Sequence, residues 1–393
     1  MRLAVLLCIA MLGVCLQVHA AASGDTGTTV PFALVADNII ISVRINGIKT
    51  AAILDTGGRN VMTPELAQRL GLAGKPKTSA GGMGAARVSV SQTHVHEVAV
   101  DGVTLRDQPF LILALPYELT NGGPQPVEVD LGYELLEDYT ATIDFVKSQV
   151  TFNPVSSGPD ERNSKIPISF SDTTPTITAT LDGISGTFLV DTGSSFGLAL
   201  TSPFVAAHRI TRTYRATEAG ATGQGLGGET YAQLARATSL TIGSNIVTEP
   251  VMQLSTDTGG TLASHAYAGV IGIDVLRNFD AVTFDYAHRT LALQPARTSD
   301  PTAAQTYDRT GMSADKNDAT AFTVSGVLPG GPAAAAGLRN GDRITAVNGV
   351  AARAVDTQQW WVLAHAQVGT VLHLVIARGG AQVVVDLRLN DVI

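Results

Sequence analysis

The chain has 393 residues, a formal net charge of −8 and no basic run, which argues against a nucleic-acid-binding protein. Apolar residues make up 45% of it, enough for packed cores, so the chain as a whole is not disordered. Only 15% of the residues are charged and 40 are glycine, which favours short strands joined by turns over long surface helices.

An uncharged apolar run occupies residues 3–18, after a positively charged start and before a small residue at Ala20. This pattern is typical of an export signal, and the run is shorter than the roughly 20 residues that a membrane-spanning helix requires. We therefore expect residues 1–20 to be a signal peptide, the protein to be periplasmic or secreted, and no membrane span to remain after cleavage. Cleavage would also remove both cysteines, Cys8 and Cys15, and with them any disulfide. A lipid anchor on Cys15 is the lesser alternative.

Two related modules follow in tandem. Residues 45–48 (Ile-Asn-Gly-Ile) lead after five residues into Leu54-Asp55-Thr56-Gly57, and 136 positions later residues 181–184 lead in the same way into Val190-Asp191-Thr192-Gly193. Such self-similarity indicates a duplicated unit. Stretches rich in Ser, Gly, Pro and charge mark the junctions. The expected domains after the signal are residues 30–158, 164–296 and 305–393.

The elements expected within each module are mostly β-strands. Residues 39–45 and 176–181 are rich in β-branched side chains and lead into Asn-Gly or Asp-Gly pairs, which are typical of tight hairpin turns. Residues 141–145 and 281–286 are strand-like runs near the end of each module. Residues 63–70 begin with Thr-Pro and carry apolar residues at helical spacing, which predicts a short helix.

Asp-Thr-Gly occurs four times, and the context separates two of the four. Asp55 and Asp191 each follow a run that predicts a buried strand. Asp25 and Asp257 lie in polar stretches, where Asp and Gly are favoured in solvated turns. We therefore single out Asp55 and Asp191 as candidate catalytic residues.

A carboxylate at the end of an apolar strand is costly unless neighbouring groups satisfy it, and the Thr and Gly after each Asp can do so while leaving room for a substrate. If the two loops meet, carboxylates about 4 Å apart repel by roughly 4 kcal/mol at an effective dielectric constant near 20. The pair would then hold one shared proton over a wide acidic range. One carboxylate could act as general base on water while the other, protonated, donates to a peptide carbonyl.

The two motifs, each followed about 80 residues later by an apolar residue and a glycine (Leu131-Gly132 and Ile271-Gly272), resemble the aspartic protease family. The short lobes and glycine-rich flaps are similar to its retropepsin-like members, here fused in tandem over residues 37–293. The resemblance implies a mainly β fold with two pepsin/retropepsin-like β-barrel lobes, no metal or other cofactor, and peptide or protein substrates. It assigns catalysis to Asp55 and Asp191. It assigns substrate binding to Thr56, Gly57, Thr192, Gly193 and Ser194 of the Asp loops, to Gly82, Met83 and Gly84 of the first flap, and to Gly225 and Gly227 of the second.

The first loop departs from the family pattern. The family usually carries Ser, Thr or Ala after Asp-Thr-Gly, as Ser194 does in the second module, but the first module has Gly58 followed by Arg59. Gly58 has no side chain to orient the Asp55 carboxylate. An Arg59 side chain pointing inward would lower the pKa of that acid.

The C-terminal residues resemble a second family. The Gly-, Pro- and Ala-rich string at residues 327–338 resembles a PDZ domain of the bacterial protease-associated kind, and the likeness extends over residues 306–392. It implies an α+β domain that binds a chain terminus as an added strand beside a groove helix, here at residues 357–366. It places the carboxylate-binding loop at Thr310, Gly311 and Met312, and puts one of Trp360 and Trp361 in the core and the other at the groove.

These features predict an exported aspartic endopeptidase that hydrolyses peptide bonds with water activated by an Asp dyad, while the PDZ domain binds the termini of substrates or partners. One alternative is a non-catalytic, chaperone-like peptide-binding protein on the same fold. Another is a serine hydrolase using Ser195, because residues 193–197 fit the Gly-x-Ser-x-Gly motif. That motif requires a helix after the turn, and residues 198–203 are a poor helix start.

Overall fold

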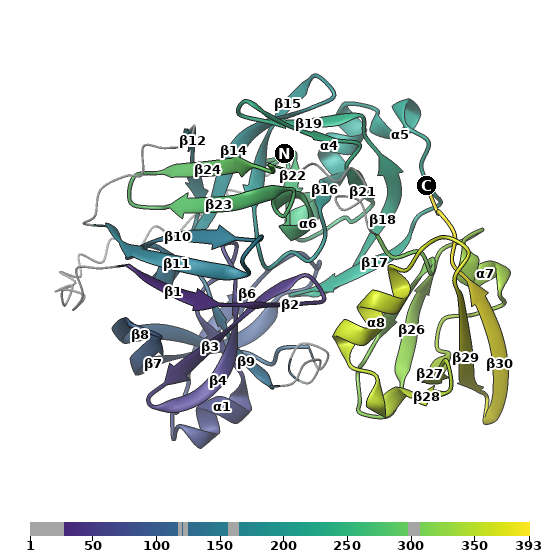
Figure 1. Cartoon of the computed structure of the whole chain (residues 1–393), viewed down its shortest axis with the longest axis horizontal. Coiled ribbons are helices and arrows are strands. Elements are labelled where there is room, and N and C mark those ends of the chain that lie inside the picture. The colour runs from purple at the N-terminus through teal and green to yellow at the C-terminus, as the bar shows by residue number, and fades with distance from the viewer. Residues whose placement is uncertain (1–26, 117–119, 121–124, 156–164, 298–306) are drawn as a thin grey trace, which may run out of the picture.

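The computed structural model describes residues 27–116, 120, 125–155, 165–297 and 307–393. Strands account for 50% of the structure and helices for 13%, which confirms the expected mainly β fold with two barrel lobes and a PDZ domain (Figure 1). The expected signal peptide at residues 1–20 and the turn at Asp25 lie outside the described residues. Within the described residues, no helix is long and apolar enough to cross a membrane.

Lobe 1 is an eight-stranded sheet that closes on itself into a barrel. Its strands lie in the order β2 (Ala33–Val35), β3 (Asn38–Ile45), β4 (Ile48–Leu54), β9 (Val127–Leu131), β5 (Val61–Met62), β8 (Val103–Ile112), β7 (Val88–Val100) and β6 (Lys75–Ala80). The barrel closes because β3 pairs with β7 as well as with β4. In β3, alternate residues from Ile39 to Ile45 are buried, as expected for a strand with one face in the core. Asn46 and Gly47 then take positive φ angles of 45° and 82°, which suit a tight hairpin.

The expected helix in lobe 1 is α1 (Pro64–Arg69). It forms where predicted because Thr63 caps it, accepting a hydrogen bond from the Leu66 N–H at 3.2 Å, and because a proline at the first helical position needs no N–H partner. A second short helix, α3 (Tyr133–Leu136), follows β9 directly.

Lobe 2 repeats this plan in a larger sheet. Its strands lie in the order β17 (Gly220–Gly225), β18 (Gly228–Arg236), β21 (Val251–Ser255), β16 (Leu198–Leu200), β22 (Gly269–Ile271), β15 (Ile184–Val190), β14 (Thr174–Leu181), β19 (Ser239–Ile242) and β20 (Asn245–Thr248), with β13 (Ser169–Ser171) on β14. Its helical segments are α4 (Ser202–Ala207), α5 (Ile210–Thr213), α6 (Ile273–Leu276) and the 3₁₀ turn η2 (Thr261–Ala263). The duplication is visible in the strand pairing, because β15-β22-β16 has the same parallel and antiparallel pattern as β4-β9-β5.

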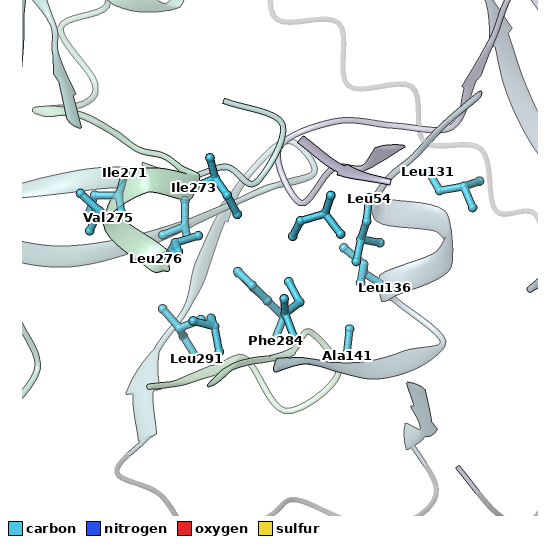
Figure 2. Packing of buried hydrophobic residues seen from close by; sticks show 14 of the residues in the cluster. Leu54, Leu131, Leu136, Ala141, Ile271, Ile273, Val275, Leu276, Phe284 and Leu291 are labelled. Atoms are coloured by element: carbon cyan, nitrogen blue, oxygen red, sulfur yellow. The ribbon is translucent and has the colours of Figure 1, made fainter. Parts of the chain in front are cut away.

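A six-stranded sheet joins the two lobes. Its order is β1 (Thr28–Pro31), β11 (Gln149–Pro154), β10 (Tyr139–Asp144), β23 (Phe279–Asp285), β24 (Thr290–Pro295) and β12 (Lys165–Pro167). The lobes meet where β10 pairs with β23, with Ala141 opposite Phe284. Figure 2 shows Leu136 of α3 and Leu276 of α6 between these helices and the sheet. Buried residues of both lobes belong to one continuous core, so the two lobes form one structural unit.

The PDZ domain has a core of its own. Its sheet has the order β25 (Met312–Asp315), β26 (Phe322–Val327), β27 (Arg343–Val347), β29 (Val371–Arg378) and β30 (Ala381–Arg388), with β28 (Val350–Ala351) on β27. The helical segments are α7 (Pro332–Ala335), η4 (Ala352–Ala354) and α8 (Thr357–Ala364), the last starting with an Asp356–Gln359 capping box. Trp360 of α8 stacks on Phe322 inside the core with ring centroids 4.9 Å apart.

Trp361 faces the protease lobes instead. Its Nε1 donates a hydrogen bond to Asp37 Oδ2 at 2.9 Å, and Asp37 also pairs with Arg277 of lobe 2 at 2.8 Å. A second contact joins the PDZ domain to lobe 2, where Ser313 Oγ of β25 donates to Ala221 O of β17 at 2.9 Å. The PDZ domain is therefore docked with β25 against β17 of lobe 2, which Figure 1 shows beside it, and with α8 against Asp37 of lobe 1 and Arg277 of lobe 2.

Candidate active site

Each Asp-Thr-Gly loop begins where a buried strand ends, at the carboxyl ends of β4 and β15. The Asp55 N–H donates to Leu131 O at 2.9 Å. In the second lobe, the Asp191 N–H donates to Ile271 O at 3.0 Å. The ends of β9 and β22 therefore extend beneath the two Asp loops in matching positions.

The glycines that follow β9 and β22 let the chain pass the Asp loops. A Cβ at Gly132 would lie 2.3 Å from Gly58 O, and one at Gly272 would lie 1.8 Å from Phe196 O. Both distances are far inside van der Waals contact, so only glycine fits at either position. This is the physical reason for the glycine in the Leu131-Gly132 and Ile271-Gly272 segments.

The two threonines of the motifs bind the loops to each other. The Thr56 N–H donates to Thr192 Oγ1 at 3.0 Å, and the Thr192 N–H donates to Thr56 Oγ1 at 3.0 Å. Each hydroxyl in turn donates across the lobe boundary, from Thr192 to Leu54 O at 2.7 Å and from Thr56 to Val190 O at 3.2 Å. Both side chains are fully buried. The four bonds hold the loops in one symmetric arrangement.

This arrangement brings Asp55 and Asp191 together within a single chain. A Cβ at Gly57 would lie 2.4 Å from Asp191 Cγ, and a Cβ at Gly193 would lie 2.4 Å from Asp55 Cγ. Each carboxylate therefore lies over the glycine of the opposite loop. Backbone amides orient both, because the Gly57 N–H donates to Asp55 Oδ1 at 2.7 Å and the Gly193 N–H donates to Asp191 Oδ1 at 2.8 Å.

The electrostatics of the pair favour a bound proton. Removal of Asp191 from water raises the pKa of its carboxyl well above the usual value, and the charge of Asp55 and a hydrogen bond with it raise that pKa further. The N–H groups of Gly193 and Ser194 act in the opposite direction, with less effect. Asp191 is thus placed to keep a proton at a pH where an isolated carboxyl would lose it.

The arginine of the first loop pairs with a buried glutamate. Arg59 Nε donates to Glu134 Oε1 at 2.8 Å, and the Asn60 N–H donates to Glu134 Oε2 at 2.8 Å. Glu134 is only 4% exposed, so these bonds satisfy an otherwise costly charge. There is also no room for a side chain at Gly58, because a Cβ there would lie 2.5 Å from Asp55 Oδ2.

We expect Glu134→Ala to lower the free energy of unfolding by about 2–3 kcal/mol, because it leaves the buried Asn60 N–H without an acceptor and removes the partner of Arg59. The matched control is Glu134→Gln, which keeps an acceptor oxygen and should cost about 1 kcal/mol. Urea denaturation of the two variants measures the difference. Equal losses for Ala and Gln would contradict this account of the loop.

The predicted flap residues of the two lobes lie against one another at the boundary of the lobes. The Gly84 N–H donates to Leu226 O at 3.0 Å, and the Thr261 N–H donates to Gly82 O at 2.9 Å. Gly225 approaches Met83 so closely that a Cβ there would lie 2.8 Å from Met83 Cβ. Gly227 lies equally close to Gly84 O, at 2.7 Å from an added Cβ. The first flap therefore interlocks with the β17–β18 hairpin.

Three residues that were not predicted as site residues also lie at the Asp-Thr-Gly loops. Tyr286 Oη donates to Thr56 O at 2.9 Å, and Thr174 Oγ1 donates to Gly57 O at 2.8 Å. Burial raises the pKa of the Asp130 carboxyl in β9, and the charges of the nearby Asp55 and Asp191 raise it further. The duplication offered a signal for Asp130, because its counterpart before Ile271-Gly272 is the apolar Val270.

Ser195 and Asp257 lie in other settings. Ser195 is exposed and is followed by β16, so the helix that a nucleophile elbow requires does not follow the turn. Asp257 accepts hydrogen bonds from the Tyr231 N–H and the Ser255 hydroxyl in a surface turn.

The predicted carboxylate-binding loop of the PDZ domain precedes β25. Thr310 and Met312 already use their N–H groups within the loop, the first donating to Asp308 Oδ1 at 2.7 Å and the second to Thr310 Oγ1 at 3.2 Å. Gly311 takes a positive φ of 67° at the turn. A cavity of about 300 Å³ lies beside the loop and is lined by residues of both units, including Gln253 of β21 and Trp361 of α8. The predicted groove thus opens toward lobe 2.

Two carboxylates over paired Asp-Thr-Gly loops, at the junction of two β-barrels, define the aspartic protease fold. Residues 41–135 and 177–275 match the model of a family described as aspartyl protease, and residues 323–378 match the model of the PDZ domain. The chain is therefore a tandem of two retropepsin-like aspartyl protease lobes with a C-terminal PDZ domain, which confirms the resemblance drawn from the sequence.

Solved structures of three proteins are similar to parts of this chain. A retropepsin-like aspartic protease from Rickettsia conorii is 17% identical, with 33% of this chain and 91% of that chain covered and a TM-score of 0.26. An aspartic proteinase from Irpex lacteus is 14% identical, with 71% and 100% covered and a TM-score of 0.44. Basic 7S globulin from soybean is 9% identical, with 70% and 96% covered and a TM-score of 0.39. No curated protein sequence matches the chain.

Proposed function

We propose that this protein is an aspartic endopeptidase in which Asp55 and Asp191 activate water for peptide-bond hydrolysis. The aspartyl protease fold with its PDZ domain supports a protease-like function. The observation that carries the proposal is the close approach of the two carboxylates, each lying over the glycine of the opposite loop. On the basis of its N-terminal apolar run, we also propose that the protein is exported.

The geometry suggests which acid plays which part. Asp191, whose pKa is raised by burial and by Asp55, holds the proton and donates a hydrogen bond to the substrate carbonyl oxygen. Asp55 takes a proton from the attacking water, so the carbonyl carbon gains an oxygen while its own oxygen accepts the proton of Asp191. Collapse of this tetrahedral species breaks the C–N bond, with the proton on Asp55 passing to the leaving amine. As this bond breaks, one hydroxyl of the tetrahedral species returns its proton to Asp191, so the dyad again holds one proton.

We further propose that the PDZ domain holds an extended peptide against the edge of β25. Among the described strands, β25 pairs only with β26, so no strand is paired with its other edge, where a peptide could add. Because β17 of the second flap lies against β25, a bound chain would pass close to the entrance of the cleft.

The pH dependence of hydrolysis tests the proton assignment. Since catalysis needs one proton on the dyad, kcat/KM should fall as pH rises through the elevated pKa of Asp191, and activity should persist well above pH 3.8, the ordinary value for an aspartyl side chain. It should also fall at strongly acidic pH, where both carboxyls are protonated. The measurement is kcat/KM on an unfolded protein substrate across the pH range. An activity that increases steadily into alkaline pH would contradict the assignment.

The fold-matched alternative, a peptide-binding protein without activity, makes the opposite prediction. It requires that unfolded protein or peptide binds and is recovered intact after prolonged incubation at every pH. Mass spectrometry of the incubated substrate separates the two functions, because hydrolysis produces new termini.

A further inference from the structure

The two lobes present matching surfaces beside the dyad, one strand position away from the Asp loops. We call Ile53, Val61 and Asp130 the lobe 1 wall, because Asp130 pairs in register with both of the others. Leu189, Ala199 and Val270 form the lobe 2 wall by the same pairings. Ile53 and Leu189 each lie two residues before a dyad aspartate, and residues two apart on a strand share a face. The walls therefore flank the carboxylates symmetrically.

The lobe 2 wall is apolar and already receives an apolar side chain. Leu189, Ala199 and Val270 cluster with Leu262, and Met83 at the tip of the first flap packs against this cluster. A flexible thioether side chain at this surface shows that the wall can accept an unbranched apolar group.

The lobe 1 wall differs from the lobe 2 wall because it carries the carboxyl group of Asp130 where lobe 2 has Val270. Val129 and Leu131 on either side of Asp130 are fully buried in the core, so Asp130 lies on the opposite face of β9, the face it shares with Ile53 and Val61. Its Oδ1 is buried, and no N–H or hydroxyl group of the described residues donates a hydrogen bond to it. A buried oxygen of this kind is costly unless a ligand satisfies it.

The surroundings of Asp130 are acidic. Burial raises the pKa of its carboxyl well above the usual value, and the charges of Asp55 and Asp191, a hydrogen bond with Asp55 and the charge of Glu134 raise it further. Glu134 already accepts a hydrogen bond from Arg59. The two dyad carboxylates accept hydrogen bonds from the N–H groups that follow them in their loops. The local field at the lobe 1 wall therefore favours an incoming positive charge.

We propose that Asp130 makes the lobe 1 wall select a lysine or arginine side chain of the substrate, while the lobe 2 wall takes an apolar one. The inference rests on the proposed peptidase function and names the substrate class of that site. A cationic side chain would donate to Asp130 Oδ1 and offset the repulsion among three neighbouring carboxyls. A leucine at the same place would leave that oxygen unpaired and bury it further. Preferred substrates thus have one basic and one apolar residue flanking the scissile bond.

The test compares cleavage of four peptides that differ only in the two residues flanking the scissile bond: Leu-Leu, Lys-Leu, Leu-Lys and Lys-Lys. We expect the full chain to cleave one of the two mixed peptides with a kcat/KM at least about 30-fold above Leu-Leu. Asp130→Val, which copies the residue of the lobe 2 wall, should remove this preference, so that its kcat/KM for the mixed peptides no longer exceeds that for Leu-Leu. Asp130→Asn, of the same shape without charge, should also lose it.

A second variant moves the carboxyl across the axis. Asp130→Val combined with Val270→Asp should transfer the preference for lysine to the other mixed peptide. Because the pKa of Asp130 is raised, the lysine preference of the natural chain should also grow as pH increases and more of the carboxyl ionises.

The outcomes separate this inference from the proposed function. If no peptide is cleaved by the natural chain, the proposed function fails. If peptides are cleaved but the four kcat/KM ratios are the same in Asp130→Val, the inference fails alone. Loss of all cleavage in both Asp130→Val and Asp130→Asn, with circular dichroism unchanged, would also overturn it, because Asp130 would then serve the reaction and not the choice of substrate.

Discussion

Replacement of Asp191 by Asn is expected to lower kcat on an unfolded protein substrate by about 10³-fold or more, since the variant lacks the acid that polarises the carbonyl. Asn has the same shape and can still accept from the Gly193 N–H, so the loop geometry and the fold should survive. Replacement of Asp55 by Asn should cost as much, because the two residues act as one unit and their losses do not add. The measurement is kcat and KM with each variant at the optimum pH of the natural chain.

The chain offers a matched control for this experiment. Asp257 begins the same Asp-Thr-Gly tripeptide, but its carboxylate accepts hydrogen bonds in a surface turn of lobe 2. Asp257→Asn should therefore keep kcat within a few-fold of the natural value. If Asp191→Asn cleaved as fast as Asp257→Asn, the dyad would be excluded as the source of catalysis.

Loss of a cross-lobe threonine hydroxyl is expected to have the second largest effect. Thr192→Val keeps the shape of the side chain but leaves the Thr56 N–H and Leu54 O without partners in a fully buried place. At about 1–3 kcal/mol for each of these two unsatisfied groups, the free energy of unfolding should fall by about 2–6 kcal/mol. Because both Asp loops depend on these bonds for position, kcat should fall by about 10²-fold as well.

Thr192→Ser is the control, since it retains the hydroxyl and should recover most of the stability and activity. Urea denaturation followed by circular dichroism measures the stability, and turnover at saturating substrate measures kcat. The double variant Thr56→Val with Thr192→Val should lose less than the sum of the single losses, because the four bonds form one network. Additive losses would indicate that the two threonines act independently.

The duplication and the two Asp loops were predictable because the signals are local. A buried strand that ends in Asp-Thr-Gly, and a second strand that ends in an apolar residue and glycine, are each visible within ten residues. Their repetition 136 positions later then implied a two-fold arrangement. The hairpin at Asn46-Gly47 and the helix begun by Thr63 and Pro64 formed as predicted for the same reason, since backbone preferences and capping act over a few residues.

Other features depend on residues far apart in the chain. Arg59 is 75 positions from Glu134, and only the crossing of β9 beneath the first Asp loop brings the two together. The sequence was equally compatible with an Arg59 side chain that points toward Asp55 and with the observed pair of Arg59 and Glu134. The position of the PDZ domain is decided in the same way, through contacts such as that between Asp37 and Trp361, 324 positions apart.

The sequence by itself determined that the protein has two related β lobes, a PDZ-like tail and two aspartates in equivalent loops, because these follow from short patterns and their spacing. Only the tertiary structure decided that both aspartates meet within one chain, that Arg59 pairs with Glu134, and that Asp130 lies beside the two aspartates. The reason is that strand register chooses the face on which each side chain emerges, and register is set by packing across the whole barrel. The low fraction of charged residues and the many glycines predicted strands and turns, but the position of three carboxyls at one junction depended on the fold.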